Sequence, residues 1–518
     1  MQMNRNSLAR IEINNFDGLD KLKTTQYATD KTINVIADGK NFVINDGILE
    51  VAKSPMVTNI SIPEEDKINE VENNIFICNG FGKYYVGNFY HYIYIINGWI
   101  YKLVGENLSK IYDKQLNPSA ICIMTVYADK LIIQNGIDIP IEFDGSICKK
   151  QELNDPQSVI GEDNKFIGSQ IANNSLYYFT KNYIYKPAPN TTNDFDNTLG
   201  TVDGFVPHAP QGGDILGLKQ LGGKLSIIFM ANNQTLKLLG SEPMSENATN
   251  PHTISIISNT IGAISPTAYC DTGTEIFFVS KRGIEQLSTV ETYGDIEFVN
   301  VFNKIKELIQ PYVSNETNAK YCFLTFLNDK IHILFRGLNN QSVLFSYDVI
   351  YKTIEYSEYK EKFTYMGVID NVLTFGCEDG KIYNLASDFY NHDECYFEFN
   401  FYPTKYGLGT IKKWNKLLVY CETETDTEEI KLSVRHFEQD YISANKRTVD
   451  KKIETAATWG SFQYGKAKWG SEGIRLIRFK NLGKSKAIKF RIDTTSPKQH
   501  IRIKKIELYY TPMGIVKG

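Results

Sequence analysis

Two stretches of the sequence, YADKLIIQNGIDIPIEFDG at residues 127–145 and LNDKIHILFRGLNNQSVLFSYD at residues 327–348, share one design. Each begins with a polar turn, Asp129-Lys130 or Asp329-Lys330, which is followed by an alternating apolar run. A glycine-containing turn and a second run that ends in an aromatic residue and Asp complete both stretches. Alternation with a period of two, punctuated by turn residues, predicts pairs of β-strands. The chain therefore contains at least two copies of one structural unit.

Similar strand pairs recur along most of the chain. They start at residues 89, 128, 173, 222, 272, 328 and 370. The steps are close to the ~40 to 50 residues of one four-stranded blade of a β-propeller, which buries its faces against neighbouring blades. We predict a β-propeller over residues 31–388, with seven blades, or alternatively six. A large β-sandwich is the competing interpretation, because its strands are also regularly spaced.

The pattern changes near residue 389. Longer strands with strict alternation, joined by polar loops, predict a C-terminal jelly-roll-like β-sandwich over residues 389–518, so the expected fold is all-β. Trp459 and Trp469 lie in a glycine-rich loop of this region. They are candidates for a sugar-stacking platform, although large aromatic side chains more often pack in cores and interfaces.

Charge is distributed unevenly between the two regions. From Lys446 to the end, 18 Lys and Arg face 5 Asp and Glu, a net charge of +13, whereas the rest of the chain carries −17. Opposite charges of this size suit a head-to-tail contact between copies, or a contact with phosphates. Alternatively, the basic residues form the solvated face of a sheet whose edge they protect.

The sequence offers no recognisable catalytic, cofactor-binding or metal-binding site, so we predict a non-enzymatic protein without cofactors. The glycines of residues 79–88 do not have the spacing of a phosphate-binding loop. Asp194 and Asp196 start like a calcium loop, but Leu199 and Phe205 occupy the positions of the required Gly and Glu. A turn that closes a hairpin is the better interpretation of this segment. A pair of carboxylates for glycoside hydrolysis remains an open alternative.

Residues 1–30 are expected to form an N-terminal arm. They lack the continuous apolar core of a signal peptide, and no apolar stretch in the chain is long enough to span a bilayer. The eight cysteines are scattered without metal-binding spacing. We therefore expect a soluble product made in the cytoplasm.

Several of these segments together resemble the tail nozzle, or tail stabilisation, proteins of short-tailed, podovirus-like phages. The resemblance lies in residues 213–240, residues 260–288 with the helical motif VFNKIKELI that follows, the stretch ADKLIIQNGIDIPIEFDG, and the strand pair with its Asp-Phe loop from residue 173. It covers about residues 70–390. The matching features are patterns of strands and turns, and the residues of the family's constriction cannot be located in this chain.

The resemblance implies a structural virion protein located in the tail and made in the cytoplasm of a bacterial host. Family members assemble as a homohexameric ring, contact portal-adaptor or other tail proteins, and form part of the DNA ejection conduit. Genomic DNA would pass through without sequence-specific binding. A carbohydrate-binding or glycoside-cleaving β-propeller at the host surface is the alternative function, and a bacterial scaffold propeller is a third.

Overall fold

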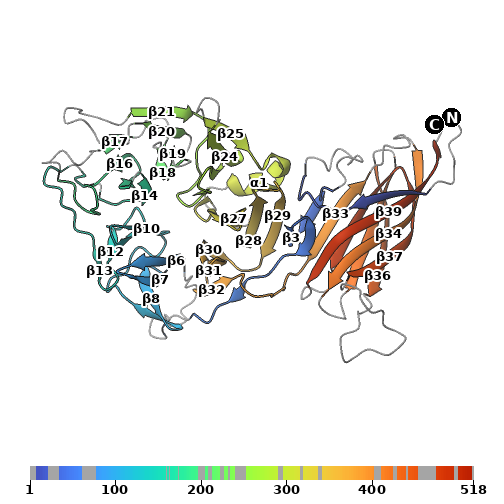
Figure 1. Cartoon of the computed structure of the whole chain (residues 1–518), viewed down its shortest axis with the longest axis horizontal. Coiled ribbons are helices and arrows are strands. Elements are labelled where there is room, and N and C mark those ends of the chain that lie inside the picture. Colours follow the sequence, from blue (N-terminus) through green and yellow to red (C-terminus); the bar gives the residue numbers. More distant parts are fainter. Residues whose placement is uncertain are drawn as a thin grey trace. The chain divides into compact units, whose positions relative to one another are not determined.

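The computed structural model divides the chain into two compact units, which are described separately below (Figure 1). One unit comprises residues 55–342 and 360–386, and the other residues 1–54, 343–359 and 387–518. The structure describes residues 8–21, 34–60, 63, 77–158, 160–162, 164–172, 174–196, 205–207, 213–221, 227–231, 234–239, 253–289, 296–314, 319–336, 341–401, 410–423, 429–438, 441–452, 474–494 and 500–515.

The first unit, called the propeller unit below, is built from small antiparallel sheets. In the described part of the chain, six of these sheets have four strands each. The first sheet consists of β6 (Cys78–Val86), β7 (Phe89–Ile96), β8 (Trp99–Val104) and β9 (Asn107–Lys110). The second consists of β10 (Ile123–Tyr127), β11 (Lys130–Gln134), β12 (Ile141–Phe143) and β13 (Cys148–Lys150). The third consists of β14 (Gly168–Ala172), β15 (Ser175–Phe179), β16 (Tyr183–Tyr185) and β17 (Phe205–Pro207).

The remaining sheets follow the same plan. The fourth consists of β18 (Ile215–Gln220), β19 (Ile227–Ala231), β20 (Thr235–Leu239) and β21 (Thr253–Ser258). The fifth consists of β22 (Tyr269–Asp271), β23 (Ile276–Ser280), β24 (Gly283–Thr289) and β25 (Ile296–Asn300). The sixth consists of β30 (Phe363–Ile369), β31 (Val372–Cys377), β32 (Ile382–Asn384) and β5 (Met56–Val57). A hairpin of β26 (Phe323–Leu327) and β27 (Lys330–Arg336) lies between the last two in sequence. The unit is of the β-propeller type.

The repeated sequence motif corresponds to the middle of each sheet. The turn that opens a repeat connects the first and second strands, and it lies one residue earlier than Asp129-Lys130: Lys130 is the first residue of β11, and Ala128-Asp129 joins β10 to β11. Both residues have positive φ, 49° and 55°, and the equivalent Asn328 and Asp329 have 51° and 59°. Two successive residues with positive φ define the type I′ turn, whose twist matches that of antiparallel strands. The two opening stretches are thus similar because they build the same hairpin.

The sheets follow one another around a circle (Figure 1). Consecutive first strands are in contact from β6 to β10, β14 and β18, and again from β22 to β26, β30 and back to β6. An ion pair of 2.7 Å between Lys219 on β18 and Asp271 on β22 joins the two series. The sheets also stack through apolar faces, for example Ile93 and Ile100 of one sheet against Leu131 and Phe143 of the next.

A strand from the start of the chain completes the circle. Residues Met56 and Val57 of β5 pair with Asn384 and Tyr383 of β32, so the last sheet takes its outer strand from the N-terminal side. Ile382 of β32 in turn packs with Tyr94 and Tyr101 of the first complete sheet. The start and the end of the chain segment that forms the propeller unit thus lie in one sheet, and the hydrogen bonds of this sheet close the ring.

The segment FNKIKELIQPYV, residues 302–313, forms a helix with one apolar face. A 3-10 turn, Asn303–Ile305, leads into α1, Lys306–Val313, which contains Pro311. Pro311 does not end the helix, because it lies in the last turn and deprives the helix of only one backbone bond. Phe302, Ile305 and Ile309 on this face are buried, and Leu308 is half-buried.

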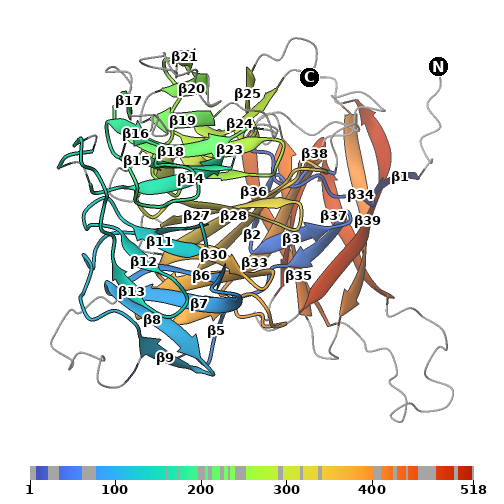
Figure 2. The same ribbon diagram turned by 60° about the vertical axis from the view of Figure 1, so that its left-hand side comes forward.

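The second unit, called the two-sheet unit below, contains longer strands in two antiparallel sheets (Figure 2). Within this unit, the strands of the first sheet follow the order β28 (Ser342–Asp348), β29 (Ile354–Tyr359), β3 (Phe42–Asn45), β4 (Ile48–Val51), β39 (Ile501–Ile515), β34 (Thr410–Thr423), β37 (Ile474–Ser485), and β1 (Ala9–Ile13) also pairs with β39; β26 and β27 precede β28 in the same sheet. The second has the order β2 (Asp38–Lys40), β33 (Cys395–Phe401), β38 (Ala487–Thr494), β35 (Glu429–Glu438), β36 (Tyr441–Lys452).

Aromatic side chains join the faces of these two sheets. Trp414 on β34 is fully buried and lies 5.9 Å from the ring of Phe401 on β33. Phe42 on β3 similarly meets Phe397 on β33, with ring centroids 6.0 Å apart. Edge-to-face pairs of this kind add about 0.5–1.5 kcal/mol each beyond the burial of their surface.

This division differs from the predicted domains 1–30, 31–388 and 389–518. Residues 9–13 form strand β1 of the two-sheet unit, and residues 38–51 supply β2, β3 and β4 to it. Residues 343–359 belong to the same unit, because Tyr356 of β29 pairs with Phe42 of β3. Local alternation predicts a strand but does not reveal which distant strand will accept its hydrogen bonds.

Candidate functional site

The propeller unit contains a cavity of about 310 Å³ at the centre of its ring of first strands. Each of the seven first strands contributes to the wall. The contributors include Tyr84 (β6), Thr125 (β10), Gln170 (β14), Lys219 (β18), Tyr269 (β22), Phe323 (β26) and Tyr365 (β30). The cavity is therefore a product of the whole ring, and no single repeat contains it.

The wall of this cavity is polar, but its charge is balanced. The ammonium of Lys219 lies 2.7 Å from Asp271 and 5.9 Å from the centre of the Tyr269 ring. Burial raises the pKa of Tyr84, Tyr269 and Tyr365 above the usual range of tyrosine, so these hydroxyls stay protonated at neutral pH. At ~30 Å³ per water molecule, the volume corresponds to roughly ten waters. The cavity thus suits water or a small polar molecule.

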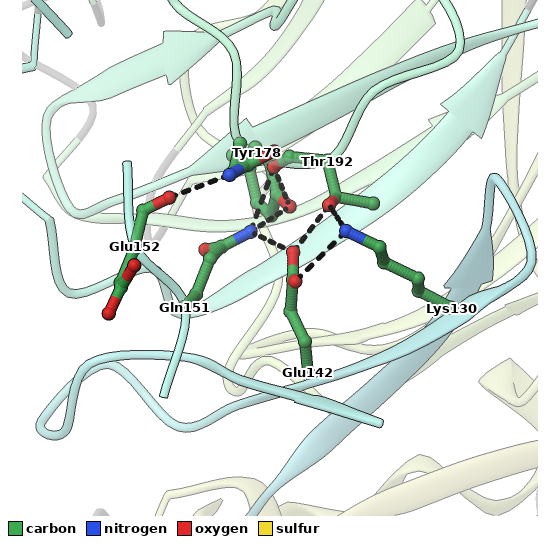
Figure 3. A network of polar contacts seen from close by, with 7 residues as sticks. Lys130, Glu142, Gln151, Glu152, Tyr178 and Thr192 are labelled. Carbon is green, nitrogen blue, oxygen red and sulfur yellow. Dashed lines mark hydrogen bonds and ion pairs between the residues drawn. The ribbon is translucent and has the colours of Figure 1, made fainter. Parts of the chain in front are cut away.

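A buried polar network surrounds Glu142 on β12 (Figure 3). Its carboxylate accepts hydrogen bonds from Lys130 Nζ at 3.1 Å, from Gln151 Nε2 at 3.1 Å and from the hydroxyl of Thr192. Gln151 Nε2 also donates to the hydroxyl of Tyr178 at 3.0 Å and to the carbonyl of Thr192 at 2.8 Å. Glu142, Gln151 and Thr192 are all at least 96% buried, with exposures of 4%, 2% and 1%.

This network attaches one sheet to its neighbour. Lys130 and Glu142 belong to the β10–β13 sheet, and Gln151 directly follows β13. Thr192 lies in the loop between β16 and β17 of the next sheet. The hydroxyl of Tyr178 donates to the carbonyl of Thr192 at 2.7 Å, and burial raises the pKa of this tyrosine. Since each oxygen of the Glu142 carboxylate already accepts hydrogen bonds inside the protein, the group holds the loop in place and is poorly arranged for acid–base chemistry.

The loop that resembled a calcium site is part of the same attachment. Asp194 Oδ1 accepts hydrogen bonds from Asn154 Nδ2 at 2.8 Å and from the backbone N–H of Asp196 at 3.1 Å. Asp196 Oδ1 accepts one from Gln157 Nε2 at 2.9 Å. Phe205 begins β17, and Leu199 lies outside the described residues. The aspartates act as turn and cross-sheet acceptors, in keeping with the interpretation of the segment as a turn.

The other sequence candidates give no further site. Trp459 and Trp469 lie outside the described residues, so their proposed role stays a prediction. Over the described ranges, no cluster of three or more His, Cys, Asp or Glu side chains is arranged to hold a metal ion. Within the same ranges, no helix has the length and apolar character needed to cross a membrane.

Neither the cavity nor the Glu142 network could be predicted from the sequence. The cavity residues come from strands that are far apart in the sequence, and Glu142 and Thr192 are separated by 50 residues. The one usable signal was Glu142 itself, a charged residue between Ile141 and Phe143 in a short apolar strand. When an acidic residue stands between two buried apolar residues, its carboxylate requires hydrogen-bond partners inside the protein.

Comparisons with known proteins leave the chain without an assigned family. No protein-family model matches it, and no curated protein matches it. Among solved structures, the computationally designed Ika8 protein is 8% identical, with a TM-score of 0.33, over 67% of this chain and 95% of its own. BamB from Moraxella catarrhalis is 12% identical, with a TM-score of 0.36, over 73% of this chain and 97% of its own.

A third solved structure is the extracellular domain of the hybrid two component system BT3049 from B. thetaiotaomicron. It is 12% identical, with a TM-score of 0.37, over 61% of this chain and 40% of its own. Scores at this level carry no argument about function. The description of the fold therefore rests on the sheets of this chain.

Proposed function

We propose that the chain is a structural virion protein, a ring-forming component of the tail nozzle of a short-tailed phage that forms part of the DNA ejection conduit. The observation that carries the proposal is the match between sequence and fold. The segments that resemble the nozzle family, such as residues 128–145 and 272–288, are equivalent parts of the propeller sheets, as they would be in a family member. The protein would be made in the bacterial cytoplasm and reside in the virion tail.

The proposal includes a propeller of seven blades. Its support is the succession of seven first strands around the cavity, of which the β26–β27 hairpin supplies one. It also includes a jelly-roll arrangement of the two-sheet unit, supported by two antiparallel sheets whose aromatic faces meet at Trp414 and Phe42.

The proposed conduit would lie between copies of the chain and outside the propeller axis. The central cavity holds about 310 Å³. The major groove of a DNA duplex is alone about 12 Å wide, so a duplex cannot pass through a space of roughly ten water molecules. A homohexameric ring would provide a wider bore. A net charge of −4 for the whole chain favours DNA that slides without being held by many phosphate contacts.

A basic surface on the two-sheet unit is a candidate for the contact between copies. Arg478 and Lys480 are exposed on β37, the last strand of its sheet, and Lys413 is exposed on the adjacent β34. Other basic residues of this unit are paired internally, as Arg502 is with Glu50 at 2.7 Å. The exposed cations therefore remain available to the acidic remainder of a neighbouring copy, in addition to protecting the sheet edge.

The size of the purified protein tests the proposal. We expect sedimentation and class averages from electron microscopy to show a closed ring, with six copies as the expected number. The double variant R478E/K480E should dissociate the ring at moderate salt, whereas K304E, a reversal at an exposed lysine of the propeller unit, should not. A protein that remains monomeric at high concentration and binds neither portal-adaptor nor other tail proteins would overturn the proposal.

A further inference from the structure

An aromatic shelf projects from the first complete sheet of the propeller unit. It consists of Tyr85 on β6 and Tyr90 on β7, which are directly opposite each other in the hairpin. Their ring centroids are 5.1 Å apart and the rings meet edge to face at 63°. Although the rings are in contact, Tyr85 is 51% exposed and Tyr90 65% exposed. Phe89, at the tip of the hairpin, is 69% exposed.

The shelf is exposed because the two neighbouring sheets cover different lengths of the β6–β7 hairpin. On one face, Val86 and His91 are buried, and the backbone N–H of Gly87 donates to Asp129 of the next sheet at 2.9 Å. On the other face, the neighbouring sheet ends at the turn between β30 and β31, where Asp370 contacts Lys83 and Tyr92. Tyr85 and Tyr90 are one step of about 7 Å further along the strands, beyond that turn.

Polar groups border the rings on the inner side. Asp370 accepts a hydrogen bond from Lys83 Nζ at 2.5 Å and another from the Tyr92 hydroxyl at 2.8 Å. The Lys83 ammonium lies 4.7 Å from the centre of the Tyr90 ring. The side chains of Lys83 and Asp370 are 29% and 50% exposed, so both can also meet a ligand from solution.

We propose that this shelf binds a pyranose sugar of a surface glycan. One face of a pyranose presents C–H groups that pack on an aromatic ring, and its edge presents hydroxyls that donate to a carboxylate and accept from an ammonium. The tyrosine rings and the Lys83–Asp370 pair supply these complementary groups side by side. The proposal concerns the propeller unit alone and does not depend on the tail function.

The size of the shelf favours a sugar over a protein partner. An aromatic side chain buries at most about 150–250 Å². The two exposed tyrosine rings of the shelf, which are each only partly uncovered, therefore offer at most a few hundred Å². A stable protein interface buries about 800 Å² on each partner. A sugar of one to three rings matches the available surface.

Saturation-transfer NMR and calorimetry with glucose, galactose, mannose, N-acetylglucosamine and their short oligomers test the proposal on the full chain. We expect at least one of these sugars to bind, and Tyr85→Ala or Tyr90→Ala to weaken the binding at least tenfold. Tyr90→Phe, which keeps the ring and is the safer variant for folding, should stay within about threefold. Val104→Ala, at a 59% exposed apolar residue of the same sheet, should bind like the wild type.

Three outcomes would overturn the proposal. The first is that no sugar of the panel binds. The second is that a correctly folded double variant, Y85A/Y90A, binds sugar as well as the wild type does. The third is that the double variant changes only the number of copies in the assembly. The last result would assign the shelf to a contact between copies. Failure of the ring proposal leaves the sugar-binding readouts unchanged, because sugar binding is measured on the full chain in any state of assembly.

Discussion

The ring of Tyr269 on β22 fills the space that a side chain at Gly217 on β18 would need. A Cβ atom built on Gly217 would lie 2.1 Å from Cε1 of Tyr269. The two strands can approach this closely only because one of them has no side chain at the point of contact. Gly217 therefore determines how the sheet beginning with β18 meets the sheet beginning with β22.

Substitution of Gly217 by Ala should destabilise the propeller unit by about 1–3 kcal/mol, since the tyrosine ring must leave its position. Chemical unfolding measures the loss. In the double variant G217A/Y269L the smaller residue makes room for the new methyl group, so the combined cost should be less than the sum of the two single costs. Strict additivity of the two substitutions would contradict the steric explanation.

The turn before β11 contains a residue that is poorly suited to its conformation. Ala128 has φ of 49°, a value that costs an L-residue with a Cβ roughly 1–2 kcal/mol. We expect Ala128→Gly to stabilise the unit by about 0.5–1 kcal/mol and Ala128→Val to destabilise it by at least as much. Thermal unfolding of both variants is the measurement. A glycine variant less stable than the wild type would show that the turn is not strained.

The sequence predicted the strands better than their partners. The hairpin turns are local features, and the repeated polar motif indicated them to within one residue of Ala128-Asp129 and Asn328-Asp329. The pairing of Tyr356 with Phe42 joins residues more than 300 positions apart, and it moved residues 343–359 out of the predicted propeller range. Such pairing depends on the final arrangement of sheets, which alternation alone does not determine.

The candidate sites were harder to predict than the fold. The aromatic shelf depends on Asp370 ending the neighbouring sheet two residues before Tyr85 and Tyr90 along the hairpin. Nothing in the segment FYHYIYII distinguishes the exposed Tyr90 from the buried Tyr94, because both have the alternation of a strand. Exposure follows from the relative lengths of adjacent hairpins, a property of the assembled ring.

Removal of the Glu142 carboxylate should release the loop that contains Thr192. Glu142→Ala leaves the donors of Lys130, Gln151 and Thr192 without their acceptor. We expect the free energy of unfolding to fall by about 2–3 kcal/mol, less than for a fully buried ion pair because Lys130 is partly exposed. Hydrogen exchange of peptides covering residues 186–196 measures the release. There, the amides of Ala188 and Phe195 are bonded to Asp194 and Asn154.

Glu152→Ala is the matched control for this experiment. Glu152 contributes to the network through its backbone carbonyl, which accepts from Asn193 Nδ2 at 2.7 Å and is retained by alanine. Exchange in residues 186–196 should therefore stay at the wild-type rate in the control and rise at least tenfold in Glu142→Ala. Equal exchange in the two variants would refute the role of the carboxylate.

The two-sheet unit should lose stability in acid through Glu50. Burial alone would raise the pKa of this carboxyl, but hydrogen bonds from His500, Arg502 and Asn45 lower it from 4.5 to about 2. Because the folded-state pKa lies below the unfolded value, the stabilisation is complete above pH 4.5 and is lost as the pH falls from 4.5 to 2.

The variant Glu50→Gln isolates this contribution. It should cost about 2–3 kcal/mol at pH 7, where the wild-type carboxylate is charged and bonded, and less than about 0.5 kcal/mol near pH 2, where half of the wild-type carboxyl groups are protonated. Urea unfolding at the two pH values measures the difference. Glu106→Gln, at an exposed carboxylate of the propeller unit, should leave the unfolding of the two-sheet unit unchanged at both. A cost of Glu50→Gln that is the same at pH 7 and pH 2 would show that packing, and not the charge of Glu50, stabilises the junction of β4 with β39.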